Sequence, residues 1–493
     1  MTRQRHPEHS EGSAGPGEVL LVSCYELGHQ PLSLASPLAS LQAAGFHPRA
    51  IDTAVEALPD EAATAARLVA ISVPMHTAMR LAEDVARQVR DANPGAHICL
   101  YGLYAWLNAE YAFQAGFADS VIGGEPEEAL VELARWLRAG PPAVAADAAQ
   151  VAATDHGGRR PSGRPRGVRF LDAPAEPVVR RQILLAPARE ALPGLEHYAH
   201  LERGGEALPA GYVEATRGCK HTCLHCPITP VYRGRFLAVP RELVLADIAA
   251  QVEAGARHIT FGDPDFLNGP THSLRIVREM RQRRPELTFD ATIKIEHILA
   301  HADLFPELRT LGCVFILSAV ESLSDTVLGH LNKGHTGADV ARALDILEAA
   351  GIPMRASLVA FTPWTTLTDY LDVLHFVEHR GLVEQVDPVQ YSIRLLVPPG
   401  SALLNEPGTA EWLGALEPAD YSYEWRHRDE RMEALYEQVS AIVAAAEGAD
   451  TWRVFAEIKT AAHTAAGLEP EPVRLTAAAT GAKPPRLTES WFC

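Results

Sequence analysis

Short apolar runs alternate with stretches of helical periodicity through residues 18–140. The expected strands are 19–22, 67–73 and 97–102, and the expected helices are 34–44, 78–93 and 127–138. Parallel strands need long crossover connections, which are usually helices. The alternation therefore predicts an α/β domain with a doubly wound parallel sheet. Residues 139–167 are rich in Ala, Pro, Gly and Arg, and we place a linker at residues 141–180.

The same alternation restarts after the linker, with longer units. The expected strands are 212–216, 258–261, 287–293, 313–320, 354–361 and 388–394, and the expected helices are 240–254, 271–283, 301–311, 324–331, 336–350 and 367–380. Six strand–helix repeats predict a partial (β/α)6 barrel at residues 181–405, with its chemistry at the carboxyl ends of the strands. Residues 406–493 are expected to form a helical extension, with one helix at 429–447.

Composition narrows the class of protein. The chain has 493 residues, 47% of them hydrophobic, which is enough apolar material for two or three cores. It contains no run of about 18 apolar residues, and the polar residues 1–17 lack the apolar segment of a secretory signal, so we expect a cytoplasmic protein without a membrane partner. Because the formal net charge is −18, we do not expect the chain to bind nucleic acid.

Three of the seven cysteines fall within eight residues, at Cys219, Cys223 and Cys226. Three thiolates can hold three irons of a [4Fe–4S] cluster and leave the fourth iron open to another ligand. The alternative is a structural zinc site completed by His221 or His225. Zinc sites usually draw four ligands from two closely spaced pairs such as C-x2-C, and the chain has no second C-x2-C pair. The spacing favours the cluster.

This C-x3-C-x2-C spacing resembles the signature of the radical SAM superfamily. The resemblance implies that S-adenosylmethionine (SAM) binds the open iron. An electron from a flavodoxin- or ferredoxin-like donor would then cleave SAM to a 5′-deoxyadenosyl radical. The radical would act on a small-molecule or peptide substrate that the sequence does not identify. In the superfamily the residue before the last cysteine is often aromatic and lies near the adenine; here it is His225.

The resemblance also assigns SAM contacts at the strand ends. Gly262, Asp263 and Asp265 correspond to a Gly- and acid-rich stretch that holds the methionyl amino group in similar enzymes. Asn268 could serve the same region. The alternative for this stretch is an Asp-Pro turn without a ligand. Glu321 and Ser322 correspond to a position that contacts the SAM ribose or carboxylate.

Two further strand ends carry residues that we single out from the chemistry of their side chains. Arg394 could hold a SAM or substrate carboxylate by a bidentate contact. Lys294 and Glu296 follow the third expected strand, and His297 follows them. Because a buried Lys–Glu pair is costly as mere stabilisation, we predict a catalytic role for Lys294 and Glu296. A salt bridge at the barrel rim is the alternative.

The N-terminal domain resembles the flavodoxin/Rossmann-like cobalamin-binding domains that precede many radical SAM cores, including the turn at 123–125. The D-x-H-x-x-G motif of those domains is absent. The segment 26–29 is its nearest counterpart, with His29 at its end. Cobalamin would then bind without a protein ligand to cobalt, or the domain keeps the fold without the cofactor. Bound cobalamin would make the chain a methyl or alkyl transferase.

The core also resembles a group of radical SAM proteins named for a CUAEP or CCAEP tail, through segments 215–230, 258–270 and 390–401. In that group a Cys is followed by selenocysteine or Cys and then Ala-Glu-Pro. This sequence ends at Cys493. We expect a selenocysteine codon after Cys493, which would make Cys493 half of a catalytic redox pair; a natural C-terminal Cys is the alternative. The nucleotides after the Cys493 codon test this. From a different functional class, a non-catalytic metal-binding scaffold also remains open.

Overall fold

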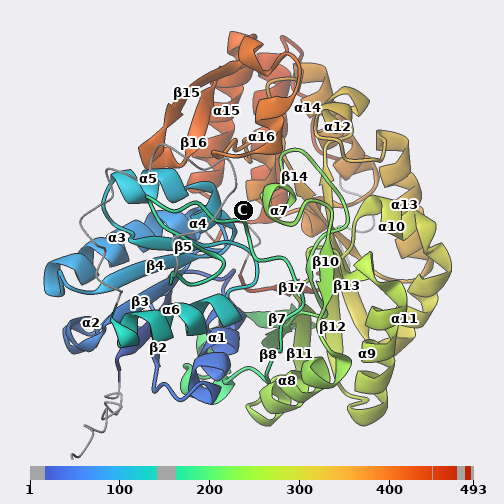
Figure 1. Ribbon diagram of the computed structural model, residues 1–493. Coiled ribbons are helices and arrows are strands. Elements are labelled where there is room, and N and C mark those ends of the chain that lie inside the picture. The colour runs from blue at the N-terminus through green and yellow to red at the C-terminus, as the bar shows by residue number, and fades with distance from the viewer. Residues whose placement is uncertain (1–16, 141–162, 447, 475–482, 490–493) are drawn as a thin grey trace, which may run out of the picture.

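A computed structural model describes residues 17–140, 163–446, 448–474 and 483–489. The N-terminal domain and a curled barrel sheet lie side by side, and the helices of the C-terminal extension lie across one end of both (Figure 1). Among the helices of the described ranges, none is long and apolar enough to cross a membrane.

The N-terminal sheet has the strand order β2-β1-β3-β4-β5-β6. Its strands are β1 Val19–Ser23, β2 Arg49–Asp52, β3 Leu68–Ser72, β4 His97–Tyr101, β5 Ser120–Ile122 and β6 Val168–Arg169. The first five are parallel, and β6 pairs antiparallel with β5. Helices cover both faces, with α1 (Leu32–Ala43) and α6 (Glu127–Ala139) in one core and α3 (His76–Ala92) in the other. The predicted doubly wound domain is confirmed, and β6 adds an edge strand from the predicted linker.

The second sheet has the order β14-β13-β12-β11-β8-β7-β17 and curls into a half-barrel (Figure 1). Its strands are β7 His200–Arg203, β8 Glu206–Val213, β11 His258–Phe261, β12 Thr288–Thr292, β13 Cys313–Glu321, β14 Met354–Leu358 and β17 Arg486–Leu487. The five strands from β8 to β14 are parallel. The helices after them include α8 Arg241–Glu253, α9 Pro270–Arg283, α11 Phe305–Leu311, α13 Gly337–Ala349 and α14 Leu367–His379. The α/β half-barrel predicted from the sequence is therefore confirmed.

Two details of the half-barrel differ from the prediction. The predicted sixth strand, 388–394, is a 3-10 helix at Pro388–Tyr391 followed by a single bridge between Phe361 and Arg394. Proline fixes φ and has no N–H to donate to a neighbouring strand, so Pro388 favours the start of a 3-10 helix over a strand. The first strand starts earlier than expected, because β7 and β8 form a hairpin. Gly204 and Gly205 make its two-residue turn with φ of +60° and +85°.

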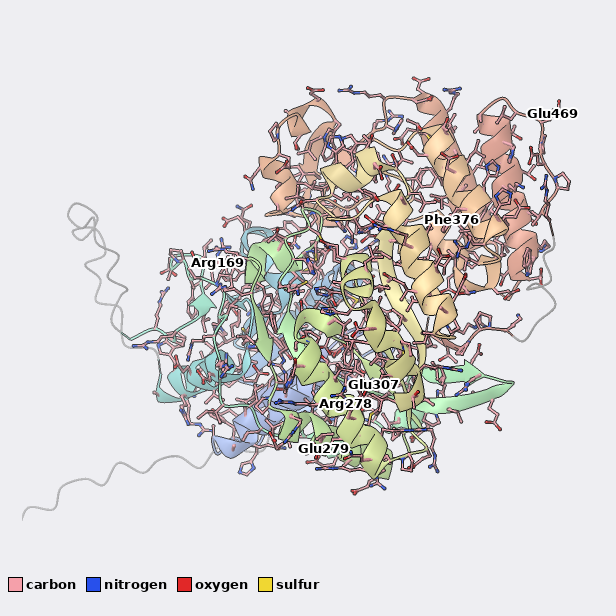
Figure 2. The ribbon with its side chains drawn as sticks, turned by 90° about the vertical axis from the view of Figure 1, so that its right-hand side faces the viewer. Arg169, Arg278, Glu279, Glu307, Phe376 and Glu469 are labelled. Atoms are coloured by element: carbon pink, nitrogen blue, oxygen red, sulfur yellow. The ribbon has the colours of Figure 1, made fainter. Side chains whose placement is uncertain are left out.

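The outer helices of the half-barrel turn charged side chains to solvent. Arg278 of α9 and Glu307 of α11 form a two-point ion pair on this surface, with N–O distances of 2.7 and 2.8 Å (Figure 2). Their side chains are 49% and 39% exposed, so the pair contributes little to stability.

The C-terminal extension touches both domains. Its two long helices, α15 (Glu430–Ala444) and α16 (Thr451–Ala465), pack on each other and on the half-barrel core. The predicted helix at 429–447 is α15. Tyr421 of the extension is buried in the core of the N-terminal domain. Strand β17 then pairs with β7, and the Tyr25 hydroxyl donates to Glu489 at 2.9 Å.

Candidate functional site

The three clustered cysteines lie in the loop between β9 (Thr216–Gly218) and α7 (Ile228–Tyr232), just after the first parallel strand of the half-barrel. Cys223 is buried, and Cys219 and Cys226 are partly buried. Burial raises the pKa of Cys219 to about 11 and that of Cys226 to about 12. These thiols are therefore protonated at neutral pH without metal, and binding of iron must release their protons.

Two side chains of the segment after β11 form hydrogen bonds with the backbone at the start of the cysteine loop. The Asp263 carboxylate accepts hydrogen bonds from Ala215 N at 2.9 Å and from Thr216 N and Oγ1 at 2.6 Å each. Asn268 Nδ2 donates to Gly218 O at 3.1 Å, and its Oδ1 accepts from Lys220 N at 3.2 Å. Both side chains therefore fix the loop that would hold the cluster.

Gly262 has a steric role that the sequence did not reveal. A Cβ at this position would lie 2.0 Å from the ring of Tyr212, so only glycine fits there. The predicted contacts of Gly262 and Asp263 with the SAM amino group stay predictions.

A compact polar cluster lies beside the loop. Helix α10 (Ile295–Ala300) begins directly after β12, which puts Glu296 and His297 in its first turn. Lys294 forms an ion pair with Glu296, and Lys294 Nζ lies 3.3 Å from His221 Nδ1. His297 Nδ1 lies 2.7 Å from Asp265 Oδ2. The predicted Lys294–Glu296 pair thus exists, and its catalytic role stays a prediction.

Glu321 is a buried acid at the end of β13, and it contacts His225, the residue before the last of the three cysteines. Its Oε1 accepts from Lys333 Nζ at 3.0 Å and lies 3.2 Å from His225 Nε2. Burial opposes its ionisation, but the Lys333 ammonium and His225 hold the pKa of Glu321 well below its usual range. Glu321 itself has a left-handed φ of +63°, a conformation that non-glycine residues seldom adopt and that recurs at functional sites. Sequence reasoning missed Lys333.

Two predicted SAM contacts have other partners in the fold. Ser322 Oγ accepts from Ser324 N at 3.1 Å. The Arg394 guanidinium donates to Glu433 at 3.0 Å and to Trp425 O at 2.6 Å, and it stacks 3.7 Å above the Trp425 ring. Arg394 therefore anchors the extension, and its predicted role as a carboxylate ligand is not supported by these contacts.

The two domains meet at a buried ion network next to the cysteine loop. Arg217 donates to Glu125 at 2.9 Å and to Glu127 at 2.6 Å, and its Nε donates to Glu214 at 2.9 Å. Glu125 also accepts from the Tyr232 hydroxyl at 2.8 Å. The turn at 123–125, noted in the sequence, therefore faces the segment that leads into the cysteines.

A cavity of about 480 Å³ opens at the carboxyl end of β1 in the N-terminal domain. Its lining includes Glu26, Gly28 and His29 after β1, Thr53 after β2, and Asp84 from α3, which follows β3. In doubly wound sheets of this strand order, ligands bind at the switch point between β1 and β3. The cavity therefore lies where this fold places a cofactor.

His29 is suited to a ligand in this cavity. Its ring is 3% exposed and stacks on Tyr212 with ring centres 4.7 Å apart. Its Nδ1 has no hydrogen-bond partner among the described residues. Burial lowers the pKa of His29 to about 4, so the ring is neutral and an acceptor at neutral pH. These features fit a cofactor of the cobalamin class. Cys493, the other residue with a predicted redox role, lies outside the described residues.

Comparison with known protein families agrees with this division. Residues 213–376 match the radical SAM superfamily, and residues 18–134 match the B12 binding domain. The chain therefore combines a radical SAM domain in its half-barrel with a B12-binding domain before it. Its cofactors are a [4Fe–4S] cluster and SAM, with cobalamin as the cofactor that the first domain implies.

Curated relatives cover only part of the architecture. The chain is 28% identical over 182 residues to the ribosomal protein uS12 methylthiotransferase RimO of Geobacter sulfurreducens, which is 34% of this chain and 39% of that protein. It is 28% identical over 198 residues to a tRNA-2-methylthio-N(6)-dimethylallyladenosine synthase of Desulfosudis oleivorans, 38% of this chain and 42% of that protein. The chain thus spans about two fifths of these relatives.

Solved structures resemble the whole arrangement. The cobalamin-dependent SAM radical enzyme OxsB, with aqua-cobalamin and SAM bound, superposes with a TM-score of 0.67 at 14% identity, covering 91% of this chain and 71% of that one. The radical SAM methyltransferase TsrM of Kitasatospora setae, with tryptophan and a SAM analogue bound, gives 0.58 at 16% identity and covers 82% of each chain. At these identities the likeness shows the fold alone. The likeness to the CUAEP-tail group stays a prediction.

Proposed function

We propose that the chain is a cobalamin-dependent radical SAM enzyme that transfers a methyl or other alkyl group to a small-molecule or peptide substrate. The observation that carries this proposal is the buried network of Arg217 with Glu125 and Glu127, which holds the cysteine loop against the B12-binding domain. Two cofactor sites in one rigid unit suit a reaction that uses both. TsrM, a methyltransferase of similar fold, supports the same class of reaction.

The chain's own residues divide the work. Cys219, Cys223 and Cys226 would hold three irons, while Asp263 and Asn268 keep their loop in place. When bound, the cluster and SAM supply reductive SAM cleavage, and cobalamin supplies alkyl transfer.

The polar side chains around the loop orient SAM and substrate. Glu321, ionised by its pairing with Lys333, is suited to accept hydrogen bonds from the SAM ribose. Lys294 and Glu296 lie beside His221 of the loop, where they can hold or move a proton on the substrate. His29, Gly28 and Tyr25 would contact cobalamin from the first domain.

A second candidate is a radical SAM enzyme in which the 5′-deoxyadenosyl radical abstracts hydrogen without alkyl transfer. The intact cysteine loop favours it as well, since that chemistry needs no second cofactor. Both candidates need a low-potential electron donor, for which a flavodoxin or ferredoxin is suited. A non-catalytic scaffold would hold a metal and turn over no SAM.

One experiment separates the three. The full chain is reconstituted anaerobically with iron and sulfide, with or without hydroxocobalamin, and then passed through gel filtration. SAM and dithionite are added, and S-adenosylhomocysteine and 5′-deoxyadenosine are quantified. We expect about one cobalamin to stay with each chain and S-adenosylhomocysteine to form only when it does. 5′-Deoxyadenosine without cobalamin retention selects the second candidate, and neither product from a fully loaded cluster selects the scaffold.

Matched variants locate the cobalamin. His29→Ala removes a ring that lines the cavity and should lower cobalamin retention. His47→Ala removes an exposed histidine of the same domain and should leave retention unchanged. Equal retention in both variants would move the cobalamin away from this cavity.

A further inference from the structure

A second group of metal-ligating side chains lies directly beside the cysteine loop. His221 Nε2 lies 3.3 Å from His297 Nε2 and 3.7 Å from Asp265 Oδ2. One ligand atom from each of the three residues lies within 4.8 Å of the other two. The three residues come from separate segments: the cysteine loop, the turn after β11 and the first turn of α10.

Two of these side chains are buried with unsatisfied atoms. Asp265 and His297 are 1% and 4% exposed. Asp265 Oδ2 and His297 Nδ1 lie 2.7 Å apart, but neither atom makes a well-directed hydrogen bond within the described ranges. Buried carboxylate oxygens and ring nitrogens almost always have a partner. A metal ion bound to Asp265 Oδ2 would supply a partner to that carboxylate oxygen.

We propose that His221, Asp265 and His297 bind one divalent transition-metal ion, separate from the [4Fe–4S] cluster. Two imidazole nitrogens and one carboxylate oxygen are a donor set that zinc and ferrous iron accept. Around a tetrahedral ion with bonds of about 2.1 Å, ligand atoms lie about 3.4 Å apart. The separations of 3.3 and 3.7 Å from His221 Nε2 match this spacing.

The neighbours of His221 suit such a site. To bind metal through Nε2, a neutral histidine must carry its proton on Nδ1. His221 Nδ1 lies 3.3 Å from Lys294 Nζ and 3.5 Å from Glu296 Oε2. Of these two neighbours only Glu296 can accept a hydrogen bond from a protonated Nδ1, so metal binding through Nε2 requires Lys294 to donate to Glu296 instead of to the ring. Glu296 is itself held beside the ring by its ion pair with Lys294. The Lys294–Glu296 pair therefore orients a metal ligand.

The ion would give the site a substrate anchor. Three protein ligands leave at least one coordination position open. A substrate hydroxyl, carboxylate or amine that fills it would be held next to the cysteine loop. The class of substrate is therefore one with a metal-binding oxygen or nitrogen close to the atom that reacts.

Cobalt is the probe for this site. The full chain with its cluster loaded is freed of loosely bound metal with a chelator and titrated anaerobically with CoCl₂. We expect one Co²⁺ per chain beyond the cluster iron, with the visible bands of nitrogen and oxygen ligation and no thiolate-to-cobalt band. His297→Gln and Asp265→Asn should each weaken Co²⁺ binding by at least about 100-fold.

A nearby histidine provides the control. The ring of His301 lies 5.9 Å from that of His297 but is not part of the trio, so His301→Ala should bind Co²⁺ like the parent chain. Cluster absorbance and circular dichroism verify that each variant is folded and loaded. No extra Co²⁺, thiolate ligation, or unchanged binding in both ligand variants overturns the proposal. Because metal binding is read without SAM turnover, this site and the proposed reaction succeed or fail separately.

Discussion

Arg217 Nη1 lies 2.6 Å from Glu127 Oε1, which joins the strand before the cysteine loop to the first turn of α6 in the B12-binding domain. The Glu127 side chain is 1% exposed, and it also accepts from Ser36 Oγ at 2.6 Å. A buried ion pair of this kind has little freedom to shift. The network therefore fixes the B12-binding domain against the segment that leads into the cysteine loop.

Replacing Arg217 tests this coupling. Arg217→Met leaves Glu125 and Glu127 buried without a countercharge, which should cost about 3–5 kcal/mol of stability. Arg278→Met breaks the exposed pair with Glu307 and should cost at most about 1 kcal/mol. Urea unfolding midpoints of both variants, followed by circular dichroism, provide the comparison. Equal shifts would mean that the Arg217 network does not stabilise the domain contact.

The pairing of Glu321 with Lys333 predicts a pH-dependent loss. In Lys333→Met the buried Glu321 loses its ammonium partner, so burial raises its pKa above the unfolded value. A carboxyl group whose pKa is raised by folding stabilises the folded state only at low pH. This stabilisation disappears as the pH rises through the raised pKa. The variant should therefore lose about 3–5 kcal/mol at pH 8 and clearly less at pH 5. Lys333→Arg keeps the charge and should lose less at both pH values; thermal midpoints that shift equally at pH 5 and 8 would contradict this.

Glu26 should make the parent chain itself less stable as pH rises. Burial raises the pKa of Glu26 to about 7, above the usual value of a free glutamate. Protonated Glu26 contributes its full stabilisation of the fold below about pH 4. This contribution is lost as the pH rises from about 4 to about 7. Glu26→Gln should flatten that part of the stability profile, by on the order of 3 kcal/mol. Glu61→Gln, at a side chain that is 75% exposed, should leave the profile unchanged in urea titrations at pH 5, 6, 7 and 8.

Lys294 should affect chemistry more than assembly. Lys294→Met removes the amine near His221 Nδ1 and should lower product formation about 100-fold, the scale of a lost proton-transfer group. Iron and sulfide content should remain at parent levels, since Lys294 is not a cluster ligand. Glu296→Gln should show the same pattern with a smaller effect. An unchanged single-turnover rate in Lys294→Met would assign the pair a structural role.

The cluster depends on the three thiolates of one loop. Cys219→Ala, Cys223→Ala or Cys226→Ala should each lose most of the iron and sulfide and all SAM cleavage, because three cysteines are the only protein ligands that the motif offers. Cys99→Ala changes a fully buried core thiol and should keep a full cluster. Visible absorbance, together with iron and sulfide analysis, measures the cluster content of the loop variants and of Cys99→Ala. A full cluster in any of the three loop variants would require another ligand.

The sequence by itself determined most of the elements and the candidate cluster loop. Apolar runs and helical periodicity are local properties, so they located most strands of both sheets and the helix at 429–447. The spacing of Cys219, Cys223 and Cys226 is also local, and it carried the class of enzyme. The local signals failed where turn chemistry decided, at the Gly204–Gly205 hairpin and at Pro388, where a strand became a 3-10 helix.

Only the tertiary structure decided which side chains meet. Asp265 and His297 are 32 residues apart in the chain, and contact arises because β11 and β12 are neighbouring parallel strands whose carboxyl ends share one edge. Arg394, which the sequence favoured as a ligand for a carboxylate, instead packs on Trp425, because the extension folds back over the half-barrel. Spacing along the chain carries no information about such contacts, since strand order and close packing set them.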